Sequence, residues 1–427
     1  MKSCPALSLL ACVIFVACAV LPAQQVPGAT QLPDRPYAIK KTWIIGGAGN
    51  WDYLTADPTA RRLFIAHSTQ VQVVDLDTGT LSGQITGLRE ARDIALDDAG
   101  QLGYISDGAD NQVKVFDRRS LQVVASIPTG PGPRALVLEP QTRLLFAVCT
   151  TPTARPAQTP NAPPVRESEI KTTITVIDTE SRTPLAEILM PGRLGFAQTD
   201  GNGQVFVNIV NRNQVARIDA QSIAAYLRAH AAVPPAANSP GPANASGPPN
   251  ASSPAKPADS TRVFDWSHES RLPNSAQSSM AIFALGSDCS DPRALAVDAQ
   301  HGRLFAACNN MKMIVLNAST GEAITSLNTG PGTDAVAYDP DHSMIYVSNG
   351  GAQGSLTIIH QDVTDTYAVV QVLSTRQRAR TLAVDRSNGQ VLLVTDLLAV
   401  DLAEPGTIGS LKTAPASGSF QVLVISN

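Results

Sequence analysis

Apolar and polar residues alternate along most of the chain in short runs separated by turns rich in Gly, Asn, Asp and Pro. Such alternation, with many β-branched residues, predicts strands rather than helices. Four kinds of run recur in a fixed order: a run that ends at an acidic residue, a run that ends in a four-residue signature, a run rich in Val and Ile, and a run that follows a turn such as Asp77-Thr-Gly79. The pattern therefore predicts a repeated unit of four strands.

The signature of the second strand occurs seven times. Its copies are Phe64-Ile-Ala-His67, Tyr104-Ile-Ser-Asp107, Phe146-Ala-Val-Cys149, Phe206-Val-Asn-Ile209, Phe305-Ala-Ala-Cys308, Tyr346-Val-Ser-Asn349 and Leu393-Val-Thr-Asp396. Successive copies start 40 to 47 residues apart, except for two longer gaps of 60 and 99 residues. A four-stranded propeller blade occupies about 40–50 residues, so the two long gaps each hold one repeat plus an insertion. Seven copies predict an all-β, seven-bladed β-propeller.

The two ends of the repeated region complete each other. The segment from Phe420 to Asn427 reads as a third strand with no successor, and the segment from Ala38 to Ile45 reads as a fourth strand with no blade. We expect the N-terminal strand to complete the last blade and to close the ring, which removes an exposed strand edge. The predicted domain spans residues 36–427.

The repeats resemble the YVTN-repeat, YncE-like family of β-propellers. Tyr346-Val-Ser-Asn349 is close to the motif that names the family, and Ile174-Thr-Val-Ile-Asp-Thr179 is close to its third strand. The resemblance covers nearly all of the mature chain. It implies an exported repeat protein that binds or organises other molecules, but a propeller fold alone does not define a function.

Three insertions interrupt the repeats, at residues 150–171, 222–279 and 397–418. The second begins with a short predicted helix that has Ser222 as its N-cap. It continues through residues 234–258, which are almost entirely Pro, Ala, Asn, Ser and Gly. That composition cannot bury enough apolar surface to become ordered, so we expect disorder there.

The first 23 residues have the composition of a secretory signal peptide. Lys2 precedes an apolar run that is too short for a membrane span, and Ala17-Cys18-Ala19 fits a cleavage site. The expected location is the periplasm or the exterior, with a lipid anchor on Cys18 as the alternative. No other apolar stretch is long enough to cross a bilayer.

Charge and composition exclude several classes of partner. The formal net charge is −4 and no Lys/Arg cluster occurs, which argues against nucleic-acid binding. No haem attachment, nucleophile-elbow, zinc-protease or P-loop motif is found, so we predict no cofactor and no metal. We expect a monomer that binds an unknown protein or a small anionic ligand.

Alignment of the repeats places one residue of each blade just before its first strand. This column reads Asp52, Arg92, Arg134, Leu194, Arg293, Asp334 and Arg380. If these side chains face the channel, their net positive charge could bind a carboxylate or a phosphate in bidentate fashion. Arg and Asp in adjacent blades could instead form structural ion pairs, and both interpretations stay open.

The last signature position forms a second column on the same face. We place His67, Asp107, Asn349 and Asp396 on its rim, and we expect Cys289 and Cys308 to lie close enough for a disulfide. The carboxylates that end the first strands are interpreted as structural, because Asp at such positions bonds to turn backbone. These are Asp57, Asp97, Glu139, Asp298, Asp339 and Asp385.

Three functions remain compatible with this sequence. The first is an exported binding or scaffold protein, which the absence of a catalytic motif favours. The second is a lactonase-like hydrolase or cyclase that uses the Arg-lined mouth, and the third is an accessory subunit of a periplasmic dehydrogenase. Whether the protein is an enzyme stays open, with binding preferred.

Overall fold

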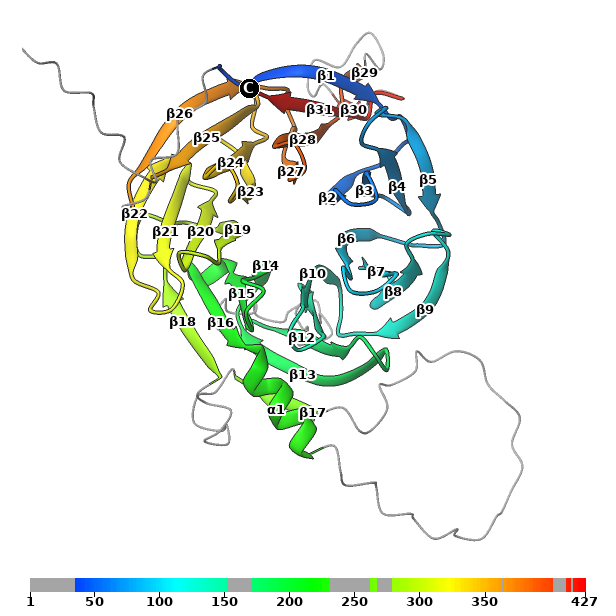
Figure 1. Ribbon diagram of the computed structural model, residues 1–427, viewed down its shortest axis with the longest axis vertical. Helices are drawn as coiled ribbons and strands as arrows, with labels where there is room; N and C mark the ends of the chain where they lie inside the picture. Colours follow the sequence, from blue (N-terminus) through cyan, green and yellow to red (C-terminus); the bar gives the residue numbers. More distant parts are fainter. Residues whose placement is uncertain are drawn as a thin grey trace, which may run out of the picture.

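The computed structural model describes residues 35–151, 170–230, 262–266, 279–362, 365–401, 412–415 and 418–427. Seven antiparallel sheets are arranged as blades around a central channel, with their first strands innermost (Figure 1). The predicted seven-bladed β-propeller is therefore confirmed. The predicted signal peptide (residues 1–23), Cys18 and the Pro-rich segment 234–258 lie outside the described residues.

Each blade has four principal strands, numbered from the channel outward. The inner strands are β2 (Trp51–Asp57), β6 (Ala91–Leu96), β10 (Pro133–Glu139), β14 (Leu194–Thr199), β19 (Pro292–Asp298), β23 (Thr333–Asp339) and β27 (Thr381–Asp385). The second strands are β3 (Arg62–His67), β7 (Leu102–Asp107), β11 (Leu144–Cys149), β15 (Gln204–Ile209), β20 (Arg303–Cys308), β24 (Met344–Asn349) and β28 (Gln390–Thr395). The third strands are β4 (Gln70–Asp75), β8 (Gln112–Asp117), β12 (Lys171–Asp178), β16 (Gln214–Asp219), β21 (Lys312–Asn317), β25 (Ser355–Gln361) and β31 (Gln421–Ser426). The outer strands are β5 (Leu81–Ile85), β9 (Val123–Pro128), β13 (Thr183–Pro191), β18 (Met280–Ala284), β22 (Ala323–Asn328), β26 (Tyr367–Ser374) and β1 (Ala38–Ile44).

The N-terminal strand closes the ring as predicted. β1 pairs antiparallel with β31, from Ala38 opposite Ser426 to Ile44 opposite Gln421 (Figure 1). It becomes the outer strand of the seventh blade, beside β27, β28 and β31. Tyr37 and Trp43 are buried on this segment, so closure adds aromatic packing to the strand pairing.

The first signature residue of each blade anchors the core between neighbouring sheets. The six aromatic copies are almost fully buried: Phe64, Tyr104, Phe146, Phe206, Phe305 and Tyr346. Large buried rings remove much apolar surface from water, and each contributes about 2–3 kcal/mol of burial energy. The aromatic signature therefore recurs because every blade interface needs a large apolar side chain.

The second insertion contains the predicted helix, α1 (Ala220–His230), and a strand that the sequence pattern missed, β17 (Arg262–Asp265). β17 pairs in parallel with β13 as a fifth strand of the third blade (Figure 1). The insertion of blade four thus covers the outer edge of blade three, which limits strand-to-strand association there. Phe264 and Trp266 pack into the same core cluster as Ile223 of α1.

The predicted N-cap of this helix is wrong. α1 begins at Ala220, two residues before Ser222. Asp219 accepts hydrogen bonds from the backbone N–H of Ser222 at 3.0 Å and from its hydroxyl at 2.7 Å. A carboxylate that bonds to the N–H three residues later caps the helix, and its negative charge suits the positive end of the helix dipole.

The other two insertions lie at the same end of the ring, between second and third strands. The first joins β11 to β12 and is described only at its ends. The third contains a two-stranded hairpin of β29 (Leu398–Asp401) and β30 (Lys412–Pro415). A short 3₁₀ turn, η2 (Val210–Arg212), lies at the equivalent place in blade four.

Candidate functional site

We call the end of the channel where the inner strands begin the upper mouth. Six of the seven inner strands carry a β-bulge there. In β2, for example, Trp51 pairs with His67, and the next regular pair joins Leu54 to Ile65. Asp52 therefore lies within the bulge, where the strand bends and a side chain can be turned into the channel.

The predicted ring residues occupy these bulges. They are the second residues of their strands rather than the residues before them: Asp52, Arg92, Arg134, Arg293 and Asp334. Only Arg380 directly precedes its strand, β27. The bulge explains how five of the blades direct a polar side chain toward one opening without breaking the sheet.

Blade four departs from the predicted column. Leu194 begins β14, pairs with Ile209 and is buried. It thus corresponds to Trp51 of blade one, which begins β2, pairs with His67 and is also buried. The bulge residue that matches Asp52 is Gly195, so the assignment of Leu194 to the ring is wrong. The turn that joins β14 to β15 is one residue shorter than in blade two, since Phe206 follows Asp200 by six positions whereas Tyr104 follows Asp97 by seven. This difference shifts the spacing on which the alignment relied.

Asp52 is the centre of the ion pairs at the upper mouth. Its two carboxylate oxygens accept hydrogen bonds from Arg92 Nη1 at 3.1 Å and from Arg134 Nη2 at 3.2 Å. Asp52 is buried, and Arg134 reaches it from blade three, two blades away. Burial alone would lower the pKa of Arg134, but the nearby Asp52 carboxylate raises it above the usual value.

A pair of aromatic rings meets across the channel just below this charge cluster. Tyr53 in blade one and Phe196 in blade four approach to 4.9 Å between ring centroids. The Arg134 guanidinium lies 5.8 Å from the Tyr53 ring centroid, which is within the range of a cation–π interaction. Burial raises the pKa of Tyr53, and Arg134 opposes that rise. We refer to Tyr53 and Phe196 as the plug.

Trp51 holds two further arginines beside the plug. The guanidinium carbons of Arg378 and Arg380 lie 5.1 and 5.3 Å from its ring centroid. Arg380 also donates to the Trp51 carbonyl at 2.6 Å, and Arg378 Nε donates to Asp396 at 2.8 Å. These contacts join blade seven to blade one across the closure of the ring.

The other side of the upper mouth is more loosely bonded. Arg293 forms an ion pair with Asp291 of its own blade. In the part of the chain that the structure describes, the Asp334 carboxylate has no hydrogen bond or ion pair. Burial raises the pKa of Asp334, and Arg380 and Arg134 oppose that rise. Glu90 and Asp291 pair with Arg92 and Arg293, so the upper mouth has mixed charge rather than the predicted net positive charge.

Asp93, which sequence reasoning missed, is buried next to the plug. Its carboxylate accepts from the backbone N–H groups of Ile94 at 2.8 Å and Leu136 at 2.9 Å, so it joins blades two and three. Burial raises the pKa of Asp93 to about 7, although these two N–H groups oppose the rise. In the aligned repeats, the position directly after the ring residue holds Tyr53, Asp93 and Phe196 in three blades and small residues in the others. These three larger side chains were the sequence feature that could have indicated the plug and Asp93.

Blade four contributes no side chain to the ring, because Gly195 stands there between Arg134 and Arg293. A Cβ on Gly195 would approach Val210 Cγ2 to 2.7 Å and Asn208 Cβ to 3.5 Å, so the neighbouring strand leaves no room for a side chain. The side chain of Asn208 is fully buried, and neither of its polar atoms has a hydrogen-bond partner among the described residues. Arg134 Nε is also buried without a partner there. Unsatisfied buried donors of this kind point to a missing partner.

The residues predicted for the rim are buried instead. His67 Nδ1 lies 2.7 Å from Gln72 Oε1, and Asp107 accepts the N–H of Glu90 at 2.8 Å. Asn349 accepts from Thr333 at 2.9 Å. Exposed fractions of 1%, 0% and 0% for His67, Asp107 and Asn349 exclude direct contact with a ligand in solution. These side chains tie the loops of the upper mouth together.

The signature of blade seven is displaced by one residue from its predicted position. Ala383 of β27 pairs with Leu392, as Thr55 pairs with Phe64 in blade one. The signature therefore runs from Leu392 to Thr395, and Asp396 follows it as the buried partner of Arg378. The sequence Leu392-Leu-Val394 offered two possible alignments, and only the register distinguishes them.

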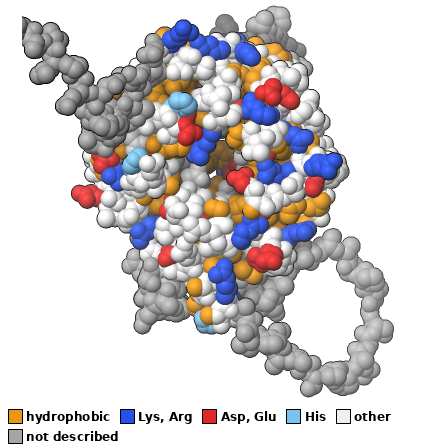
Figure 2. Space-filling view, in the orientation of Figure 1, with side chains coloured by type: hydrophobic (Ala, Val, Ile, Leu, Met, Phe, Trp, Pro, Cys, Tyr) orange, Lys and Arg blue, Asp and Glu red, His pale blue; other side chains and the backbone are white. Residues whose placement is uncertain are grey.

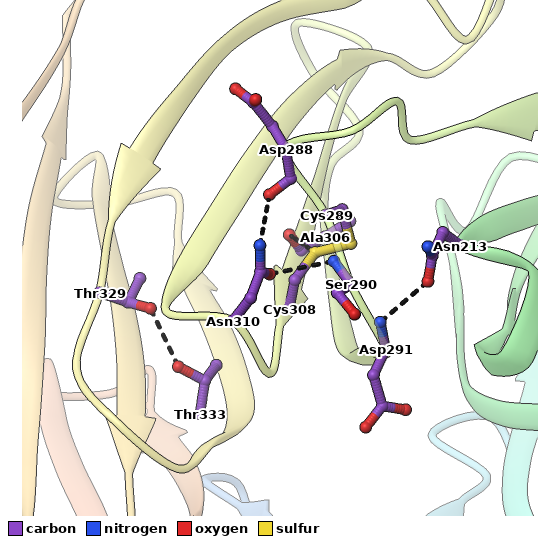
Figure 3. The surroundings of a disulfide bond; sticks show 10 residues. All are labelled: Asn213, Asp288, Cys289, Ser290, Asp291, Ala306, Cys308, Asn310, Thr329 and Thr333. Atoms are coloured by element: carbon purple, nitrogen blue, oxygen red, sulfur yellow. Dashed lines mark hydrogen bonds between the residues drawn. A yellow bond between two sulfur atoms is a disulfide. The ribbon is translucent and has the colours of Figure 1, made fainter.

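Cys289 and Cys308 are joined by a disulfide, with their Cα atoms 5.5 Å apart (Figure 3). Around it, Asn310 accepts the N–H of Ser290 at 3.0 Å and donates to the Asp288 carbonyl at 2.9 Å. Asn213 of blade four accepts the N–H of Asp291 at 2.9 Å. The disulfide and these amides hold the loop that leads to Arg293. Cys149 is buried and unpaired, and burial raises the pKa of its thiol to about 12.

The opposite end of the channel, where the inner strands end, is the lower mouth. Here the predicted structural carboxylates are buried and bonded to turn backbone, and Asp57, Asp97 and Asp385 also bind arginines. Asp97, for example, accepts from Arg143 Nη1 and Nη2, both at 2.7 Å, and this bidentate contact lowers the pKa of Asp97. Asp200 is the seventh member, which the shifted alignment of blade four had hidden. It accepts the N–H groups of Asn202 and Gln204.

Two further properties of the described residues bear on function. None of the helices in this part of the chain is long and apolar enough to cross a membrane. Within the same residues, no three His, Cys, Asp or Glu side chains are grouped so as to hold a metal ion. In the space-filling view, a hollow at the centre of the ring is bordered by acidic and basic side chains (Figure 2).

Comparison with known proteins supports the fold. No protein-family model matches the sequence, and no curated protein matches it. Among solved structures, the chain is similar to one titled "Structure of U3-55K", with 8% sequence identity and a TM-score of 0.58, over 89% of this chain and 97% of that one. It is also similar to "Crystal structure of RRP9 WD40 repeats", with 8% identity and a TM-score of 0.58, over 90% and 96% of the two chains. Identities this low show a shared propeller architecture and nothing about function.

Proposed function

We propose that this protein is an exported binding propeller of the YVTN-repeat kind, which holds a small carboxylate or phosphate at its upper mouth. Export rests on the composition of residues 1–23, and the family on the repeat motifs. The ligand class rests on the arginines of the ring. Binding without turnover is favoured because the described residues of the mouth form ion pairs and ring contacts, and none of them holds a nucleophile beside a general base.

The exposed guanidinium groups on either side of Gly195 carry this proposal. Most guanidinium donors of the mouth are already bonded, since Arg92 and Arg134 bind Asp52 and Arg380 binds the Trp51 carbonyl. Arg134 and Arg293 belong to the two blades that flank Gly195, and their side chains are 38% and 43% exposed. A carboxylate or phosphate that replaces Asp291 on Arg293 would accept hydrogen bonds from that guanidinium, and Arg134 would add positive charge.

Isothermal titration calorimetry with succinate and inorganic phosphate tests this function. We expect one saturable site, weakened about tenfold by Arg293→Gln, because a charge-assisted hydrogen bond is lost. Arg89→Gln is the matched control: Arg89 is an exposed arginine at the same end of the ring, 3.5 Å from Asp110, and its loss should leave the affinity unchanged. Absence of binding, or equal weakening by both variants, would show that the ring is structural.

A further inference from the structure

A separate cavity lies below the plug. The inner strands of all seven blades line it, and its volume is about 400 Å³. Its middle layer consists of the residues that lie opposite the first signature positions. These are Thr55, Ala95, Val137, Gln198, Ala296, Ala337 and Ala383. Four of the seven are alanines, so side chains do not fill the centre of the channel.

The walls of this cavity combine aliphatic and polar side chains. Leu54, Ile94, Leu136, Val336 and Leu382 line the layer above the small residues, and Leu96, Leu138, Val297 and Val384 line the layer below. Asp93, Gln198 and Thr199 add polar groups to the lining. From Tyr53 at the plug to Asp57 at the lower mouth the strand advances four residues, or about 13 Å at about 3.3 Å per residue. We call this elongated cavity the tube, and its aliphatic side chains suit an extended hydrocarbon chain.

The lower mouth beside this tube carries an excess of positive charge on one side. A depression of about 920 Å³ spans blades seven, one and two and shares Thr55, Ala56, Leu96, Val384 and Arg386 with the tube. Arg62, Arg119 and Arg386 line it. They come from three different blades, so the depression exists only in the closed ring.

These three guanidinium groups have few bonds of their own. Arg62 donates to the Arg118 carbonyl at 2.7 Å. In the part of the chain that the structure describes, the side chains of Arg119 and Arg386 make no hydrogen bond or ion pair. The acidic neighbours in the depression are Asp57, which is already paired with Arg118, and Asp98, whose side chain is fully exposed. The local charge therefore favours an anion.

We propose that the lower half of the channel binds an amphipathic anion, a carboxylate with an unbranched apolar tail. The carboxylate binds Arg386 and Arg119, whose donors suit bidentate contact. The tail enters the tube past Thr55 and Val384 and ends below Tyr53 and Phe196. The far side of the lower mouth does not compete for the anion, because Arg143 is bonded to Asp97 there and Asp200 and Asp298 add negative charge.

Calorimetric titration of the full chain with decanoate, below its micelle concentration, tests this site. We expect one decanoate per chain, with affinity about tenfold weaker in Arg386→Gln, which removes one charge-assisted contact. Ala337→Leu, which fills the tube, should abolish binding. Arg386 is exposed, so its replacement leaves the core intact and keeps the test valid even if Ala337→Leu unfolds the protein.

Three comparisons make the result decisive. Arg293→Gln, at the upper mouth, should bind decanoate as the unaltered protein does, which separates this site from the proposed anion site at Gly195. Butyrate, with the same carboxylate and a short tail, should bind at least tenfold more weakly, and decyltrimethylammonium should not bind. Equal affinity in Arg386→Gln, tight binding of the cationic amphiphile, or no saturable decanoate binding would each overturn the proposal.

Discussion

The two mouths of the channel use the same kinds of charged residue in opposite ways. At the lower mouth, acidic residues end the inner strands and bond to their own turns and to the next blade, as Asp97 does with Arg143. At the upper mouth, the charges sit in β-bulges and reach across the channel, as Arg134 does to Asp52 two blades away. The lower arrangement repeats in almost every blade, whereas the upper one differs in each.

This difference shows where the repeat has been free to vary. A turn carboxylate satisfies backbone N–H groups that would otherwise be unpaired, so its loss is costly in every blade. A bulge residue faces the channel and satisfies no backbone group of its own turn. The upper mouth can therefore carry Asp, Arg or Gly in different blades without changing the fold. Four experiments test this contrast, and they follow in order of decreasing expected effect.

Removal of residues 36–46 should have the largest effect, because it opens the ring and disturbs both mouths. The deletion removes β1 and the buried side chains of Tyr37 and Trp43. Loss of one large buried aromatic side chain costs about 3–5 kcal/mol, so we expect at least about 5 kcal/mol from urea unfolding. A synthetic peptide of residues 36–46 should restore part of this stability, and an unchanged unfolding midpoint would contradict closure by β1.

Asp93 should make the upper mouth sensitive to pH. Its pKa in the folded protein is about 7, above the value of about 4 in an unfolded chain, so the folded state binds the proton more tightly. Stability should therefore fall as pH rises from about 4 to about 7, by up to about 4 kcal/mol. Urea unfolding at pH 5 and pH 8 should show that Asp93→Asn removes this decrease.

Asp98→Asn is the control for that measurement, because Asp98 follows the same inner strand and is fully exposed. It should keep the pH dependence of the unaltered protein. An identical pH profile for Asp93→Asn and the unaltered protein would show that Asp93 does not titrate in this range.

The disulfide should stabilise the upper mouth by about 3 kcal/mol, because it closes a loop with a sequence separation of 19 residues. Cys289→Ser with Cys308→Ser should lower the unfolding free energy by this amount and loosen the loop before Arg293. Thiol counting in denaturant checks the bond directly: over residues 35–427, unreduced protein should react at Cys149 alone, and reduced protein at three cysteines. Three reactive thiols before reduction would contradict it.

Arg143→Met should have the smallest effect of the four, about 2 kcal/mol. It leaves the buried Asp97 carboxylate without its bidentate partner, but the Arg143 side chain is 38% exposed, which reduces the loss below that of a fully buried pair. The contact lowers the pKa of Asp97, so its contribution is present at neutral pH and disappears as pH falls through that lowered value. Arg119→Met, at an exposed turn of the same mouth, should change stability little at any pH.

Prediction from sequence was most successful where one interaction repeats in every blade. The aromatic signature, the strand-end carboxylates and the orphan strands at the two ends led to seven blades and to closure by β1. Prediction failed where a single residue shifts the register. The turn after β14 is one residue shorter than in the other aligned blades, so Leu194 took the place of Gly195 and Asp200 was overlooked. Asp396 was assigned to a signature that ends at Thr395.

The architecture follows from the sequence alone, because alternation and period are local properties that survive in each repeat. The sequence also placed the ring residues at one mouth of the channel, since every blade starts its first strand there. Which of those residues meet depends on the three-dimensional fold. Tyr53 touches Phe196 from blade one to blade four, Arg134 reaches Asp52, and Arg62, Arg119 and Arg386 line one depression. Such contacts join residues more than fifty positions apart, and only closure of the ring sets the distances between them.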